Sequence, residues 1–97
     1  MIITNKEERV TIALTGRLDT ITAPELTEAV KDLTFQELTL DLTDLEYISS
    51  AGLRALLVCK KTADSQKAPF TAANPAPAVL EVMRMSGFDK VLDIRMD

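Results

Sequence analysis

Apolar and polar residues alternate along several short stretches of the chain, and each such stretch predicts a strand with one buried face. The clearest stretch is Arg9–Thr15, in which branched apolar residues occupy every second position. Leu38–Leu42 repeats this pattern with three leucines. Shorter β-rich stretches predict further strands at Met1–Asn5, Phe70–Ala73 and Val91–Ile94. Asp44–Ile48 is interpreted as a bend followed by a short extended piece.

Apolar residues spaced three and four apart predict three helices, at Ala23–Leu33, Ala51–Lys61 and Ala78–Ser86. Thr22–Glu25 has the form of a capping box with proline in the first turn. The second helix is apolar on almost every side, which predicts that it is largely buried. The polar stretch Lys60–Pro69 is predicted to be a loop, and Gly87 a left-handed helix cap.

Strands and helices therefore alternate in the order β-β-α-β-(β)-α-β-α-β. Helices between strands imply parallel neighbours joined by crossovers, whereas the first two strands form an antiparallel hairpin. The predicted fold is α/β, with a mixed β-sheet. A length of 97 residues predicts one domain spanning residues 1–97.

The composition narrows the range of functions. No apolar stretch approaches the roughly 20 residues that span a bilayer, and the chain turns polar after Met1–Thr4, so we expect neither membrane insertion nor a signal peptide. A single cysteine, Cys59, fits a reducing, cytoplasmic location and a core position. The net charge of −4 and 4% aromatic residues argue against a nucleic-acid partner.

The chain contains no histidine, which excludes Ser-His-Asp and Cys-His catalysis. One thiol and no imidazole cannot form the usual zinc site. The three glycines lie far apart, so no glycine-rich phosphate loop exists. We therefore expect no enzyme, no cofactor and no metal ion.

The candidate chemistry lies in Asp41–Leu57, where Ser49, Ser50 and Gly52 stand at the junction between extended chain and the second helix. One interpretation is local: a serine caps the helix and Gly52 permits close packing. The other is a phosphate acceptor, because free N–H groups and the helix dipole tolerate an added anion at this position. Arg54 follows Ser50 by four residues and either neighbours such an anion or lies over apolar surface.

At these residues the sequence resembles the STAS domains, of the bacterial anti-sigma factor antagonist kind. The resemblance includes Leu14–Asp19 and Thr22-Ala23, is densest at Asp41–Leu57 and returns at Val82–Ile94. It implies a mixed sheet with helices packed mainly on one face. It also implies a partner-switching function: a serine kinase that is itself an anti-sigma factor binds the unphosphorylated antagonist and phosphorylates it, and a PP2C-type phosphatase restores it.

The family's target serine lies two places before the glycine, so the resemblance implies Ser50 as the phosphorylated residue, with Ser49 as the alternative. Ser49 stands where many members have aspartate, and Ala51 where many have serine or threonine. The expected partner-binding residues are Asp19, Ser49, Ser50, Gly52 and Arg54. Asp19 either faces the partner or makes local turn bonds. The alternative function is a constitutive STAS subunit of a larger assembly, such as a lipid-transport ABC complex.

Overall fold

The computed structural model describes residues 1–97 and begins with the expected antiparallel hairpin. β1 (Ile2–Lys6) pairs with β2 (Arg9–Leu18) across a turn at Glu7 and Glu8, whose φ angles of 53° and 67° match the positive values of a tight hairpin turn. The Asn5 carboxamide oxygen accepts the Glu8 N–H at 3.0 Å and closes this turn.

Every later strand runs parallel to β2, and a helix precedes each one. The elements that follow β2 are α1 (Ala23–Lys31), β3 (Glu37–Ile48), α2 (Ser50–Ser65), β4 (Phe70–Ala73), α3 (Pro77–Met85), a 3-10 turn η1 (Phe88–Lys90) and β5 (Asp93–Arg95). The strand order in the sheet is β1-β2-β3-β4-β5. The predicted α/β fold with a mixed sheet is confirmed.

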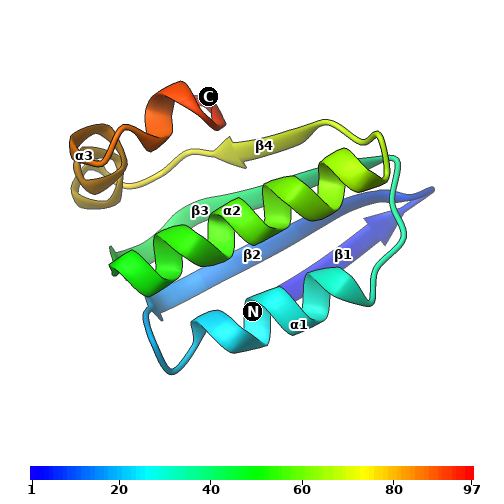
Figure 1. Ribbon diagram of the computed structural model, residues 1–97, viewed down its shortest axis with the longest axis horizontal. Helices are drawn as coiled ribbons and strands as arrows, with labels where there is room; N and C mark the ends of the chain where they lie inside the picture. The colour runs from blue at the N-terminus through cyan, green and yellow to red at the C-terminus, as the bar shows by residue number, and fades with distance from the viewer.

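The helices lie mainly on one face of the sheet, as expected. In Figure 1, α1 and α2 lie side by side across that face, and α3 lies beyond one end of it. The buried core lies between the sheet and these helices and is built largely from Ile12 and Leu14 of β2, Leu38, Leu40 and Leu42 of β3, Leu26 and Val30 of α1, and Leu56 and Cys59 of α2. The buried position expected for Cys59 is confirmed, and burial raises the pKa of its thiol to about 12, so the sulfur stays protonated.

β3 differs from the prediction because it is one strand of 12 residues rather than a strand, a bend and a separate extended piece. Its register against β2 shifts twice, between Ala13 and Thr15 and again between Gly16 and Arg17 of β2. Each shift adds one residue to β3, so Leu42, Leu45 and Ile48 all face the core at intervals of three. These bulges break the period of two on which the prediction rested.

α2 also differs from the prediction. It begins one residue earlier than expected and continues to Ser65, so the predicted loop at Lys60–Pro69 is wrong over its first half. The polar composition of this stretch concealed two buried positions, Ala63 and Ala68, and Ala63 continues the core face of the helix. The helix is also less buried than predicted, since Arg54 and Lys61 are exposed. No helix in the chain is long and apolar enough to cross a bilayer.

The remaining differences concern ends and caps. β2 continues to Leu18 because Gly16, at φ +70°, allows the strand to bend without breaking.

The predicted capping box at Thr22 is wrong: its side chain makes no cap bond to α1. Gly87 has the predicted left-handed conformation, with φ +79°. α1 ends two residues before the predicted Leu33, α3 begins and ends one residue earlier than predicted, and β5 begins two residues after the predicted Val91.

The Gln66 side chain ties the end of α2 to the loop between α1 and β3. Its oxygen accepts the Phe35 N–H at 2.9 Å, and its amide nitrogen donates to the Leu33 carbonyl at 2.9 Å. Both backbone groups are partly buried, and Phe35 belongs to the core. One side chain therefore satisfies two backbone groups from a segment more than 30 residues away.

Replacing Gln66 by alanine should lower the free energy of unfolding by about 1–3 kcal/mol, because a partly buried N–H and C=O lose their partners. Urea unfolding followed by circular dichroism measures this change. Ser65→Ala is the matched control, since the Ser65 hydroxyl bonds only to Thr62 of its own exposed turn, and we expect a change within about 0.5 kcal/mol. Equal effects of the two substitutions would contradict the bridging role.

Candidate functional site

The candidate site lies at the carboxyl ends of β2 and β3. The two strands are parallel neighbours, and their last residues, Leu18 and Ile48, are register partners. Asp19 and Ser49, the residues that follow, therefore leave the sheet at the same edge. α1 and α2 both begin near this edge, as Figure 1 shows, so the residues expected to form the site are brought to one end of the domain.

Ser49 is the N-cap of α2. Its backbone is extended, with φ −96° and ψ 177°, and its side-chain oxygen accepts the Gly52 N–H at 3.2 Å. The Ser49 N–H donates to the Leu18 carbonyl at 3.0 Å, and the hydroxyl lies 3.4 Å from the same oxygen. The half-buried Ser49 side chain thus satisfies the start of the helix, as a cap does.

Ser50 is the first residue of α2, and its environment differs from that of Ser49. The residue is exposed, and its hydroxyl makes no hydrogen bond to any other group of the chain. Water and an external molecule can both reach the oxygen. The two adjacent serines therefore separate into one with a structural bond and one with a free hydroxyl.

Gly52 allows the first turn of α2 to approach the end of β2. A Cβ atom at this position would lie 2.5 Å from the Leu18 carbonyl oxygen and 2.7 Å from Cγ1 of Ile48. Real Cβ contacts are not that short, and the closer neighbour is backbone that cannot turn away. The close packing expected of Gly52 is present.

Arg54 lies one turn after Ser50 on the exposed side of α2. It forms no ion pair within the chain, and with Ala51 and Val58 it lines a shallow groove between α1 and α2. The structure fits both alternatives considered for Arg54 from the sequence. Its side chain lies beside apolar groove residues, and its guanidinium remains available for an anion.

Asp19 makes the local turn bonds that the sequence left as one of two options. One of its carboxylate oxygens accepts the N–H groups of Ile21 at 3.0 Å and Thr22 at 3.2 Å, and the other lies 3.4 Å from Nε of Arg17. The Thr22 N–H bond above all, with those from Ile21 and Arg17, holds the pKa of Asp19 below its usual range against an opposing effect of burial.

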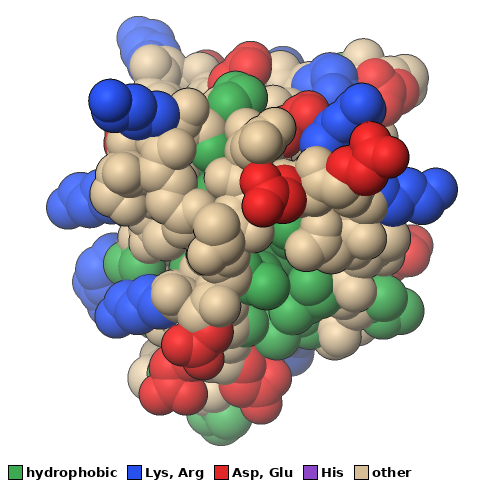
Figure 2. Space-filling model, turned by 90° about the vertical axis from the view of Figure 1, so that its right-hand side faces the viewer, with side chains coloured by type: hydrophobic (Ala, Val, Ile, Leu, Met, Phe, Trp, Pro, Cys, Tyr) green, Lys and Arg blue, Asp and Glu red, His purple; other side chains and the backbone are tan.

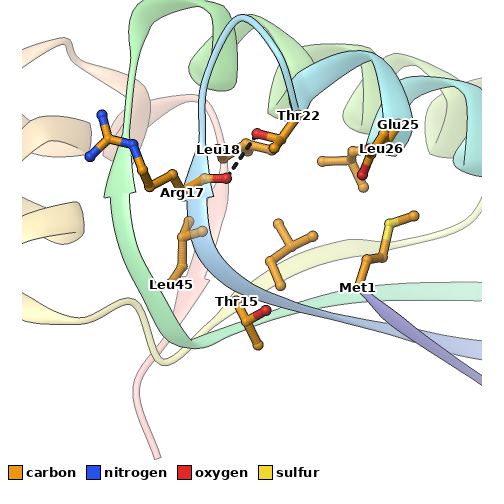
Figure 3. Close-up of a pocket in the computed structure, with 9 residues that line it drawn as sticks. Met1, Thr15, Arg17, Leu18, Thr22, Glu25, Leu26 and Leu45 are labelled. Carbon is orange, nitrogen blue, oxygen red and sulfur yellow. Dashed lines mark hydrogen bonds between the residues drawn. The ribbon is translucent and has the colours of Figure 1, made fainter.

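A small cavity lies behind this turn, between β2, α1 and the amino terminus, and Figure 3 shows its walls. The Thr22 hydroxyl donates to the Arg17 carbonyl at 2.8 Å at one side of it. The hydroxyl therefore serves the turn instead of the helix cap. The cavity measures about 60 Å³, far below the roughly 300–1,000 Å³ of typical ligand pockets.

Sequence reasoning missed two exposed apolar residues at the same edge. Ile21, in the loop before α1, is 82% exposed, and Tyr47, near the end of β3, is 42% exposed. The Arg17 guanidinium carbon lies 4.1 Å from the centre of the Tyr47 ring, a cation–π contact between register partners. A bulky apolar residue in the polar loop between Asp19 and Thr22 was the available signal for Ile21.

Gly52→Ala should lower the free energy of unfolding by about 1–3 kcal/mol, because the added methyl group collides with the Leu18 carbonyl. Helix propensity alone predicts the opposite sign, a gain of about 1 kcal/mol. Ser50→Ala is the control at the exposed neighbour, with an expected change within about 0.5 kcal/mol. Thermal and urea unfolding decide between the signs, and a stabilised Gly52→Ala protein would rule out the close contact.

The stabilising effect of the Asp19 charge should depend on pH. Its folded-state pKa is lowered, so its contribution is present above the unfolded pKa of about 4 and is lost as the pH falls through the folded value. Urea unfolding of wild type and Asp19→Asn should differ most at neutral pH and converge as the pH falls through the lowered folded-state pKa of Asp19. Asp93→Asn, at an exposed residue without an ion pair, is the control. A pH-independent difference for Asp19→Asn would show that the charge is not the cause.

Comparison with known proteins agrees with this geometry. A family model described as "Mlab, STAS domain" matches residues 2–94. A proposed anti-sigma factor antagonist from Thermotoga maritima superposes with a TM-score of 0.87 at 19% identity, over 97% of this chain and 84% of the other. An antagonist from Mycobacterium paratuberculosis gives 0.85 at 22% identity over 97% and 82%. The antagonist SpoIIAA in its unphosphorylated form gives 0.84 at 17% identity over 96% and 85%. The chain belongs to the STAS domain family.

Proposed function

We propose that this STAS domain is an anti-sigma factor antagonist, a binding module controlled by phosphorylation of Ser50. In its unphosphorylated form it binds a serine-kinase anti-sigma factor, and a PP2C-type phosphatase reverses the modification. The three antagonist structures with the same fold support this class of function. The residues proposed to face the partner are Asp19, Ser49, Ser50, Gly52 and Arg54.

The observation that carries the proposal is the difference between the two serines at the start of α2. Ser49 uses its oxygen to cap the helix, whereas the Ser50 hydroxyl is exposed and free of internal hydrogen bonds. A kinase can remove the Ser50 proton and attach phosphate without breaking a bond that holds the fold. Ser49, the alternative acceptor, would lose its cap on modification.

Phosphate on Ser50 adds about 1.5 to 2 negative charges at the amino end of a 16-residue helix, where free N–H groups and the helix dipole favour an anion. The folded domain therefore tolerates the group. A partner that packs against this edge must desolvate it or meet it with an acidic surface, and misplaced like charges cost several kcal/mol. The modification acts on binding and leaves folding intact.

In this proposal the domain supplies only the acceptor hydroxyl, and the kinase supplies nucleotide and catalytic groups. A carboxylate with an ordinary pKa of about 4 is a weak base for a serine hydroxyl at neutral pH. The chain contains no histidine to take that role. Phosphate should therefore arrive and leave only through separate enzymes.

A constitutive subunit of a larger assembly is the second candidate function. Two observations favour it: the matching family model is described by the Mlab STAS domain, and serine replaces the aspartate that precedes the target serine in many antagonists. In such a subunit Ser50 would be an unmodified contact residue. Genes for permease components beside this one would support this candidate, and genes for a serine kinase and PP2C-type phosphatase would support the switch.

Incubation with ATP, magnesium and a serine-kinase anti-sigma factor should add one phosphate, detected by intact mass. Ser50→Ala should remove it, whereas Ser49→Ala should keep most of it, because only the Ser50 hydroxyl is free. The domain with ATP and magnesium alone should gain no mass. Phosphate that survives Ser50→Ala and disappears in Ser49→Ala would move the assignment to Ser49.

Ser50→Asp should weaken kinase binding at least about tenfold, equivalent to about 1.4 kcal/mol, while the melting temperature stays near that of wild type. A negative charge at the helix start is tolerated in the fold and unfavourable in the interface. Isothermal calorimetry and thermal unfolding measure the two effects. Ser65→Asp, at the exposed carboxyl end of the same helix, is the control for added charge. Unfolding of Ser50→Asp would identify the hydroxyl as structural and remove the main support for the switch.

A further inference from the structure

An open, largely apolar groove lies between α1 and α2 on the helical surface. Ala23 and Thr27 of α1 and Ala51, Ala55 and Val58 of α2 line it, and the space between them measures about 230 Å³. The groove is open to solvent along its length, unlike the small cavity behind the Asp19 turn. Its walls are almost entirely apolar apart from threonine hydroxyls and one arginine.

The two helices are parallel to each other, because both connect parallel strands and both begin at the carboxyl edge of the sheet (Figure 1). One end of the groove therefore adjoins Ser50, since Ala51 is a lining residue. The nine residues of α1 set a length of about 13 Å at roughly 1.5 Å per residue. Between two and three turns of a bound helix fit along this length.

The α2 rim of the groove is basic, whereas the α1 rim is mixed, because exposed Glu28 follows the lining residue Pro24 by four residues. Arg54 lines it directly, Lys61 lies seven residues further along the same face of α2, and Lys31 lies four residues after Thr27 on α1. All three are exposed. The ion pairs of the domain involve other residues, namely Arg17–Asp19, Lys60–Asp64 and Arg95–Asp97.

This distribution contrasts with the charge of the whole chain, which is −4. Figure 2 shows Lys and Arg side chains along its left-hand edge, the side on which the helical layer lies; acidic side chains lie at the bottom of the view and, among further Lys and Arg side chains, across its upper right. Two unpaired cations on the α2 rim, Arg54 and Lys61, complement an occupant that carries apolar residues on one face and carboxylates on the flank beside α2.

We propose that the α1–α2 groove is the docking site for an acidic amphipathic helix of the partner. Apolar side chains spaced three and four apart on that helix fill the groove, and carboxylates on its flank pair with Arg54 and Lys61. The inference deepens the proposed function, since it assigns a partner chemistry to the surface that adjoins Ser50. Phosphate on Ser50 then competes with these carboxylates for Arg54.

Two lactam-bridged helical peptides of about 14 residues test the proposal, since this length covers the whole of α1. Both carry the same leucine face, and one has glutamates and the other lysines on its flanks. In a titration of the ¹⁵N-labelled full chain, the acidic peptide should shift the amide signals of groove residues in α1 and α2. The basic peptide should leave them unchanged.

The double variant Arg54→Glu/Lys61→Glu should lose at least about tenfold in affinity for the acidic peptide. Lys60→Glu/Lys90→Glu changes the net charge equally at residues outside the groove and should bind like wild type. Circular dichroism of both variants should match wild type. Equal binding of the two peptides, signal shifts elsewhere, or equal loss in the two double variants would overturn the proposal.

These measurements use unphosphorylated protein without a kinase, so they are independent of the switch. If the acidic peptide binds the groove but the kinase does not phosphorylate Ser50, the proposed function alone is refuted. Phosphorylation of Ser50 without groove binding would refute this inference alone.

Discussion

The contact between the first turn of α2 and the carbonyl group of Leu18 determines most of the site. That oxygen accepts the Ser49 N–H and lies against the bare Cα of Gly52. A side chain at position 52 would displace the helix from the end of β2. Because the start of α2 is held this closely, the side chains around it have fixed directions. Ser49 points back to the sheet, and Ser50 and Arg54 point to solvent.

Most of the fold could be predicted from the local pattern of apolar and polar residues. Alternation predicts a strand and three-to-four spacing predicts a helix wherever an element keeps one period along its length. The Arg9–Thr15 and Phe70–Ala73 stretches are examples. β3 could not be predicted as one strand, because its two bulges replace a period of two by intervals of three. At the first bulge the Asp41 carboxylate accepts the Thr43 N–H and hydroxyl, and these contacts are visible only in three dimensions.

The candidate site shows the same limit. The spacing of the two serines before Gly52 predicted that both lie at a helix start. It did not predict which of them caps the helix, because that depends on the backbone conformation of one residue. Asp19 and Ser49 come from segments 30 residues apart, and only the parallel pairing of β2 with β3 brings them to one edge. Ile21 and Tyr47 were missed because single apolar residues in loops and strand ends carry no periodic signal.

The parallel pairing of β2 with β3 also affects how the domain folds. The partners in this ladder, from Arg9 with Glu37 to Leu18 with Ile48, are separated by the whole of α1 and its two loops. That segment must be closed, at an entropic cost, before the first ladder bond forms, and such non-local pairing slows folding from microseconds towards milliseconds or longer. The hairpin of β1 with β2 and the helices can form earlier, but the edge that holds Ser49 and Ser50 exists only after this closure. A chain emerging from the ribosome therefore lacks this edge until residue 48 and the helix beyond it have been synthesised.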